Sequence, residues 1–184
     1  MNTVSYRDSE FKVSNFITLP EISKPLPKTG KNEFSGFETV LFNKLLTHLI
    51  HCPIIAKGSY KIPSSVESIG IEAFSQCKEI TSVVIPESLI KIGCLAFENC
   101  LSLTSILIPD SIKEIGDKAF SNCNCLKSIY IKTKSVFILS ENSDVFYNVN
   151  KKDCILYVLR GLKKEYQLAS QWKEFQFIVE TDEF

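Results

Sequence analysis

The sequence predicts a solenoid in which stacked coils of 23 residues each contribute a short strand to a parallel sheet. Two observations predict it: a fixed repeat of 23 residues, and apolar residues that recur at the same places in every copy. Nine of the 23 positions are identical in all three regular copies. These copies are residues 62–84 (IPSSVESIGIEAFSQCKEITSVV), 85–107 (IPESLIKIGCLAFENCLSLTSIL) and 108–130 (IPDSIKEIGDKAFSNCNCLKSIY).

The end of each repeat predicts the strand. In the first copy Ile80, Val83 and Ile85 alternate with outward-facing residues closely enough to indicate a short strand with one buried side. A proline follows each such strand and should end it, because proline cannot donate a hydrogen bond to a sheet ladder. These prolines are Pro63, Pro86 and Pro109.

The middle of each repeat predicts a turn and then a filled interior. Gly70 follows the apolar Ile69, and we expect a turn there because glycine permits a positive φ. Ala73 and Phe74 then supply a small and a large residue that fill the coil. A fully buried phenylalanine contributes about 1.5–3 kcal/mol, so three stacked ones should be a main source of stability. They are Phe74, Phe97 and Phe120.

Both ends of the array need caps, because a terminal coil cannot cover its own apolar side. Residues 34–61 predict an irregular N-terminal repeat, and residues 131–184 predict an irregular repeat with a C-terminal cap. Within the cap, apolar residues near helical spacing predict an amphipathic helix over 162–175, followed by a short strand at Phe177–Val179.

The two parts of the chain differ in composition. Residues 1–33 lack the repeat, and three prolines between positions 20 and 27 indicate a linker or a loosely attached extension. The remainder, residues 34–184, is expected to form a single solenoid domain. A chain of 184 residues is long enough for one sizeable core and too short for two ordinary ones.

The pattern IPxSVxxIGxxAFxxCxxLTSIxIP over residues 59–131 resembles the BspA-type leucine-rich repeat. The flanks resemble that family's irregular leading repeat and its closing unit, so the likeness covers about residues 34–180. The sequence departs from the family at Leu159, where a proline is usual. The resemblance implies a leucine-rich-repeat solenoid (β-rich, of the α/β class) from a surface protein, a kind common in host-associated anaerobic bacteria and some protist parasites.

Composition argues against several classes of function. The 21 Lys and Arg residues balance the 21 Asp and Glu residues, so no net field recruits nucleic acid or an anionic membrane. The longest apolar stretches are a few residues, whereas a transmembrane helix needs about 20. Residues 1–16 carry charges where a secretory signal would be apolar. The visible N-terminus therefore shows no export signal, although the resemblance implies an extracellular or cell-surface protein.

The seven cysteines and two histidines offer alternative sites. Cys77, Cys100 and Cys123 lie 23 residues apart and could form a thiol ladder or metal site. The favoured interpretation is a column of small, buried, inert side chains. His48 and His51 form an H-x-x-H pattern, but the usual zinc spacing and a second cluster are missing, so no metal or cofactor is predicted.

Two further patterns are set aside. Residues 26–30 spell LPKTG, which resembles a sortase signal for cell-wall attachment, but that signal works near a C-terminus and is interpreted here as coincidence. No Ser/His/Asp or Cys/His arrangement with supporting motif context occurs, and glycine-rich phosphate loops are absent from the sequence, so the chain is predicted to be no enzyme.

The best candidate site is the outward side of the repeated strand. If Ile106 and Ile108 point inward, a period of two turns Leu107 outward. A column of apolar residues with polar flanks results, which is what a protein partner can grip, although ordinary strand formers would look the same. The column is Val84, Leu107 and Tyr130, flanked by Thr81, Thr104 and Lys127.

The sequence thus favours a non-enzymatic recognition or adhesion module that binds a protein, such as a host extracellular-matrix or cell-surface protein, through its strands. The alternative is a structural spacer, or a fragment of a longer repeat protein, with no specific ligand. An undetected hydrolase is a third hypothesis.

Overall fold

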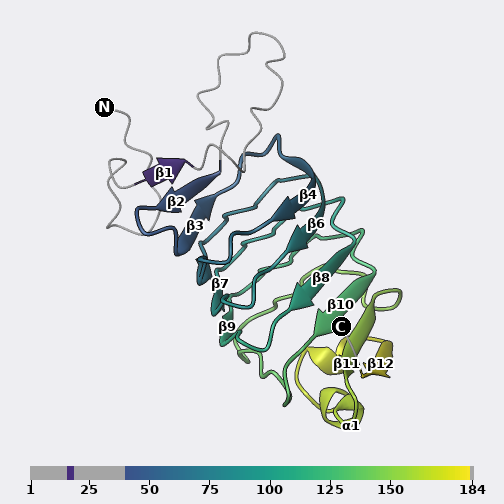
Figure 1. Cartoon of the computed structure of the whole chain (residues 1–184). Helices are drawn as coiled ribbons and strands as arrows, with labels where there is room; N and C mark the ends of the chain where they lie inside the picture. Colours follow the sequence, from purple (N-terminus) through teal and green to yellow (C-terminus); the bar gives the residue numbers. More distant parts are fainter. Residues whose placement is uncertain (1–15, 19–39, 183–184) are drawn as a thin grey trace.

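Two six-stranded sheets form opposite sides of the solenoid (Figure 1). The computed structural model describes residues 16–18 and 40–182. The long-strand sheet contains β4 (Lys57–Lys61), β6 (Glu79–Val84), β8 (Ser105–Ile108), β10 (Ser128–Ile131), β11 (Ile155–Leu159) and β12 (Phe177–Thr181). The short-strand sheet contains β1 (Phe16–Thr18), β2 (Leu41–Asn43), β3 (His48–His51), β5 (Ser68–Ile69), β7 (Lys91–Ile92) and β9 (Glu114–Ile115).

The predicted parallel stacking with a 23-residue period is confirmed. The chain alternates between the sheets, so each regular coil supplies one long and one short strand, and all long strands run parallel. Ser82 pairs with Ser105, which pairs with Ser128, each one repeat further on. The long strands end just before the repeat prolines, as expected: β6 ends two residues before Pro86 and β8 directly before Pro109.

The expected role of the repeat glycines is wrong in its physical reason. Gly70, Gly93 and Gly116 have no positive φ. They are required because neighbouring coils touch there: a Cβ on Gly93 would lie 2.6 Å from the carbonyl carbon of Gly70. The left-handed residues come two positions later, at Glu72, Leu95 and Lys118.

A continuous stack of aromatic rings fills the solenoid. The ring centroids of Phe74 and Phe97 are 4.9 Å apart and those of Phe97 and Phe120 are 5.2 Å apart, with nearly parallel planes. Phe146 extends the stack at 5.7 Å from Phe120. The coil after the third regular repeat therefore keeps the large interior residue, although its sequence lacks the preceding alanine.

The C-terminal cap differs from the predicted single helix over 162–175. It contains a short α-helix, α1 (Lys163–Tyr166), and one 3-10 turn, η2 (Trp172–Glu174). Between them Gln171 takes a positive φ and is buried. Its side-chain Oε1 accepts a hydrogen bond from the Val145 N–H of the preceding coil, at 2.9 Å. This break lets two separate aromatic anchors reach the core.

These anchors are Tyr166 and Trp172, both fully buried as predicted. The Tyr166 hydroxyl accepts from the Phe137 N–H at 3.1 Å, and the Trp172 Nε1–H donates to the Phe137 carbonyl at 2.7 Å. Trp172 and Phe175 pack on Phe146, so they close the apolar interior at this end.

At the N-terminal end of the solenoid the strands pair differently, because this end contains antiparallel pairs. β2 and β3 pair antiparallel, and β1 adds antiparallel to β2, whereas β3 continues into the parallel part through β5. Phe16–Thr18 thus belongs to the short-strand sheet. The rest of the proposed extension over residues 1–33 lies outside the described residues.

Candidate functional site

The outward side of the long-strand sheet, here called the strand face, carries the predicted binding residues. Strand pairing places one residue from each strand in a single outward row across the sheet. The row begins with a charged residue and continues with apolar ones: Lys61, Val84, Leu107, Tyr130, Tyr157 and Val179.

All three predicted members of the apolar column lie in this outward row. Val84 is 50% exposed, whereas Leu107 and Tyr130 are half-buried by their neighbours. The inward neighbours Ile106 and Ile108 are buried, as the period of two requires. The predicted flanking residues Thr81, Thr104 and Lys127 are exposed beside the row.

The flanking residues lie on a ladder of backbone bonds. The Thr104 N–H and hydroxyl both donate to the Thr81 carbonyl, at 3.1 and 3.2 Å, and the Lys127 N–H donates to the Thr104 carbonyl at 2.8 Å. Their backbone positions are therefore fixed, and the Lys127 side chain extends into solvent.

Sequence reasoning missed the larger half of the apolar surface, because β11 and β12 do not follow the 23-residue period. Tyr157 stacks on Tyr130 with ring centroids 4.7 Å apart, and Val179 is 40% exposed beside it. The alternation in residues 155–159 and 177–181 was the signal that could have found them. With Leu107 and Tyr130 these residues form what we call the apolar patch: Ile155, Tyr157, Leu159, Phe177 and Val179.

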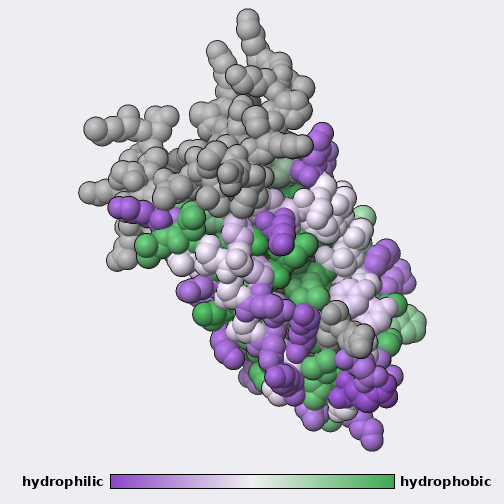
Figure 2. Space-filling model, in the orientation of Figure 1, coloured by the Kyte–Doolittle hydropathy of each residue, from purple (hydrophilic) through white to green (hydrophobic). Residues whose placement is uncertain are grey.

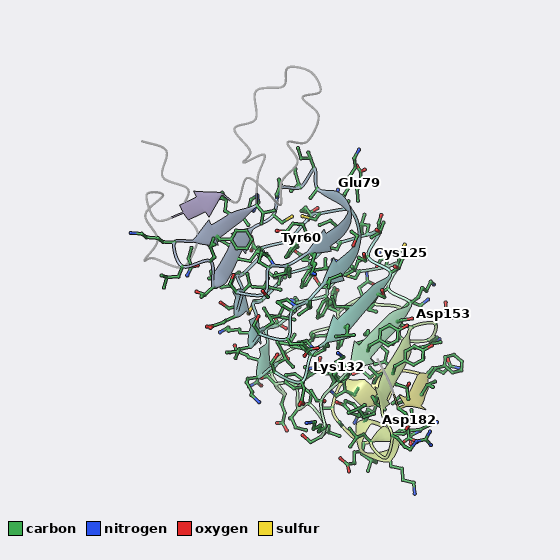
Figure 3. The ribbon with its side chains drawn as sticks, in the orientation of Figure 1. Tyr60, Glu79, Cys125, Lys132, Asp153 and Asp182 are labelled. Atoms are coloured by element: carbon green, nitrogen blue, oxygen red, sulfur yellow. The ribbon has the colours of Figure 1, made fainter. Side chains whose placement is uncertain are left out.

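The patch has polar borders at both ends of the strands. Aromatic rings project outward from β10 to β12 in Figure 3, and hydrophobic residues reach the surface there in Figure 2. Figure 3 also shows Glu79, Cys125 and Asp153 along the margin where the strands begin, and Lys132 and Asp182 where they end. Lys132 is held by Glu87 at 2.8 Å.

The ring geometry limits what the patch can bind. Because Tyr130 and Tyr157 stack on each other, one face of each ring is covered, and in the row the two rings lie between Leu107 and Val179. A ligand therefore cannot stack on the faces that these two rings turn to each other. Apolar side chains of a protein partner fit such a surface better than flat rings do.

The cysteine column supports the structural interpretation. Cys77, Cys100 and Cys123 are buried and stack, and the Cys100 Sγ–H donates to the Phe74 carbonyl of the coil before it, as Cys123 does to Phe97, both at 3.1 Å. Burial raises the pKa of the Cys123 thiol to about 12. These thiols serve as small interior hydrogen-bond donors.

Cys52 joins this column although it has no 23-residue spacing. It is fully buried, and a hydrogen bond with Cys77, together with burial, raises the pKa of its thiol far above the ordinary range. Only an irregular coil of 25 residues separates it from Cys77.

His48 and His51, the two histidines of the H-x-x-H pattern, differ in their surroundings. His48 bonds through Nδ1 to the Ser68 hydroxyl at 2.6 Å, whereas burial lowers the pKa of His51. Among residues 16–18 and 40–182, no three His, Cys, Asp or Glu side chains are grouped to hold a metal ion. The LPKTG segment lies outside the described residues. In the part of the chain that the structure describes, no helix has the length and apolar character needed to cross a membrane.

The fold and its period define the class of protein as a leucine-rich-repeat solenoid. A family model described as the BspA type leucine rich repeat region matches residues 56–157 in six copies. The chain belongs to this family, whose repeats are consistent with a protein-interaction module and whose members are generally non-enzymatic.

Solved structures agree on the fold. A leucine-rich repeat protein from Eubacterium ventriosum is 24% identical to this chain, with a TM-score of 0.55. The matched region covers 65% of this chain and 31% of that protein's chain. The pneumococcal vaccine antigen PcpA is 22% identical to this chain, with a TM-score of 0.51. The matched region covers 77% of this chain and 46% of the PcpA chain. This chain thus spans less than half the length of either. A search of curated proteins finds no match.

Proposed function

We propose that the chain is a protein-binding module and that the strand face is its binding surface. The observation that carries this proposal is the contiguous apolar patch, formed by residues from four neighbouring strands, β8, β10, β11 and β12. Exposed apolar surface of this kind, rimmed by polar side chains, is typical of protein interaction sites. Aromatic residues such as Tyr130 and Tyr157 are also enriched among side chains that dominate binding energy.

We further propose adhesion at a cell surface as the setting. The family resemblance implies surface display, and PcpA, which shares the fold, is named as a vaccine antigen. Binding through the patch needs no catalytic group, so this role is non-enzymatic. A host extracellular-matrix or cell-surface protein is the partner that this setting favours.

The test is an array of purified extracellular-matrix proteins and glycans probed with the full chain and a double variant, Leu107→Asp with Tyr130→Ala. We expect at least one protein to bind the wild type and binding to fall at least tenfold in the double variant. Ile90→Asp is the matched control, since Ile90 is 45% exposed immediately before β7 in the short-strand sheet. Unchanged binding by the double variant would contradict the site.

The alternative is a structural spacer without a specific ligand. It is favoured if the wild-type chain retains nothing on the same array while remaining folded. Binding of glycans alone would also reject a protein-binding role.

A further inference from the structure

The two edges of the long-strand sheet are built differently. β4 forms one edge, and it has the usual protection against added strands: Lys57 and Lys61 are exposed, and the register shifts between Gly58 and Ser59. β12 forms the other edge, and its sequence FIVET contains no lysine, no proline and no bulge. Such an edge accepts a further strand unless something covers it.

The backbone groups of Ile178 and Glu180 have no hydrogen-bond partner on the outer side of β12 among residues 16–18 and 40–182. The Arg160 N–H donates to the Thr181 carbonyl at 3.1 Å, so alternate residues of β12 face β11. The residues between them, Ile178 and Glu180, therefore direct their N–H and C=O groups away from the sheet. β11 is the strand that pairs with β12 in residues 40–182.

The charged groups beside this edge are already engaged. Glu180 turns its carboxylate to the start of the cap, where Oε1 accepts from the Gly161 N–H at 2.8 Å and the Lys163 N–H at 3.2 Å. Asp182 and Arg160 pair with each other through two hydrogen bonds. None of these charges extends across the edge in the way that a guarding lysine does.

The apolar patch continues up to the same edge. Phe177 is 48% exposed and Val179 is 40% exposed, and both point to the strand face beside Ile155 and Tyr157. A strand added next to β12 would place every second side chain against Phe177 and Val179. Backbone bonds would then give affinity, and alternate apolar side chains would give selectivity.

We propose that β12 binds an extended segment of the partner protein as a seventh strand of the long-strand sheet. The segment has apolar residues at alternate positions, which lie on the outer part of the apolar patch, and it contains no proline where it pairs. This inference rests on the proposed function of the strand face and specifies the form in which the partner binds.

A second copy of the chain fits this edge less well. The antiparallel register that pairs both open residues sets Ile178 of one copy opposite Glu180 of the other. Ile178 is buried in its own core and the Glu180 carboxylate is engaged at the start of the cap, so this pair contributes nothing. On the strand face the same register sets Val179 opposite Val179 but Phe177 opposite Thr181, so only one of the two exposed apolar residues of β12 meets an apolar partner. An independent segment can instead supply matching apolar residues.

The test uses the full chain and peptides selected on it from a random ten-residue display library. Glu180→Pro removes an outward N–H that takes no part in pairing with β11, so the sheet tolerates it. Glu180→Ala is the matched control, because it also loses the carboxylate but keeps the N–H. Each selected peptide is titrated against the three proteins, and N-methylation of its alternate amides is compared on the wild-type chain.

We expect alternating apolar peptides that bind Glu180→Ala within about twofold of wild type and Glu180→Pro at least tenfold more weakly. N-methylation of one alternate set of amides should abolish binding, and methylation of the other set should not. This second measurement decides the matter even if Glu180→Pro fails to fold.

Three results would overturn the inference: peptides that bind Glu180→Pro as well as wild type, no alternating peptide among those selected, or a wild-type dimer in sedimentation that Glu180→Pro dissociates. The last would show a second copy at the edge. Glu180→Pro leaves Leu107 and Tyr130 intact, so a failure at the edge is distinguishable from a failure of the strand face.

Discussion

Replacing Phe97 with alanine removes the central ring of the aromatic stack. Phe97 is fully buried and lies 4.9 Å from Phe74 and 5.2 Å from Phe120, so the substitution breaks contacts with two coils at once. The transfer of the ring from water contributes about 1.5–3 kcal/mol, and each aromatic pair adds about 0.5–1.5 kcal/mol. The free energy of unfolding should fall by about 3–5 kcal/mol, the usual cost of truncating a buried phenylalanine.

Urea unfolding followed by circular dichroism measures this loss. A domain is usually stable by about 5–15 kcal/mol, so the variant should unfold at clearly lower urea concentration and its melting temperature should drop by about 6–20 °C. Phe177→Ala is the matched control: Phe177 is 48% exposed, and its removal should cost about 1 kcal/mol or less.

The reasoning is refuted if Phe97→Ala costs less than about 1 kcal/mol, or if Phe177→Ala costs as much as Phe97→Ala. Either result would mean that the stacked rings are not a main source of stability. A changed dependence of the unfolding free energy on urea would instead show that the array no longer unfolds as one unit.

Three other predictions concern the coil contacts, the thiols and the cap. Gly93→Ala should destabilise the fold by about 1–3 kcal/mol in urea unfolding, because its Cβ would lie 2.6 Å from the Gly70 backbone; a neutral result would contradict the close approach of the coils. Of the seven cysteines, Cys94 and Cys125 are exposed and should react rapidly with a thiol reagent, whereas the others should react only in denaturant; rapid native labelling of all seven would show an open interior. Tyr166→Phe should cost about 1–3 kcal/mol, because it leaves the partly buried N–H of Phe137 without its acceptor, and unchanged thermal stability would argue against that bond.

The regular coils could be predicted from sequence because equivalent residues in each repeat have equivalent neighbours in the adjacent coils. A residue such as Phe97 must meet identical neighbours above and below, so the period of the sequence becomes the period of the structure. The same logic predicted the outward row, since strands with a period of two and coils with a period of 23 determine which side chains share a face. Chain periodicity does not reveal how closely backbones approach, which is why the reason for Gly93 was wrong.

The ends could not be predicted in the same way, because they are specified by single contacts. The break at Gln171 depends on its amide meeting the Val145 N–H, a residue 26 positions away. Similarly, Phe146 occupies the ring position in a coil that has lost the alanine before it. Such long-range matches leave no repeat in the sequence, so one amphipathic helix was the simplest interpretation of residues 162–175.

The irregular end is also where the strand face becomes most apolar. The regular repeats place serine two residues before the outward row, as in Ser105 and Ser128, whereas β11 and β12 place Ile155 and Phe177 there. The cap thus closes the interior through Trp172 and still leaves apolar side chains exposed on its outer side. A cap needs apolar residues only on its inner side, so the residues on its outer side can vary without loss of stability. The inner side of the cap therefore confers stability, and its outer side is the part that we propose binds a partner.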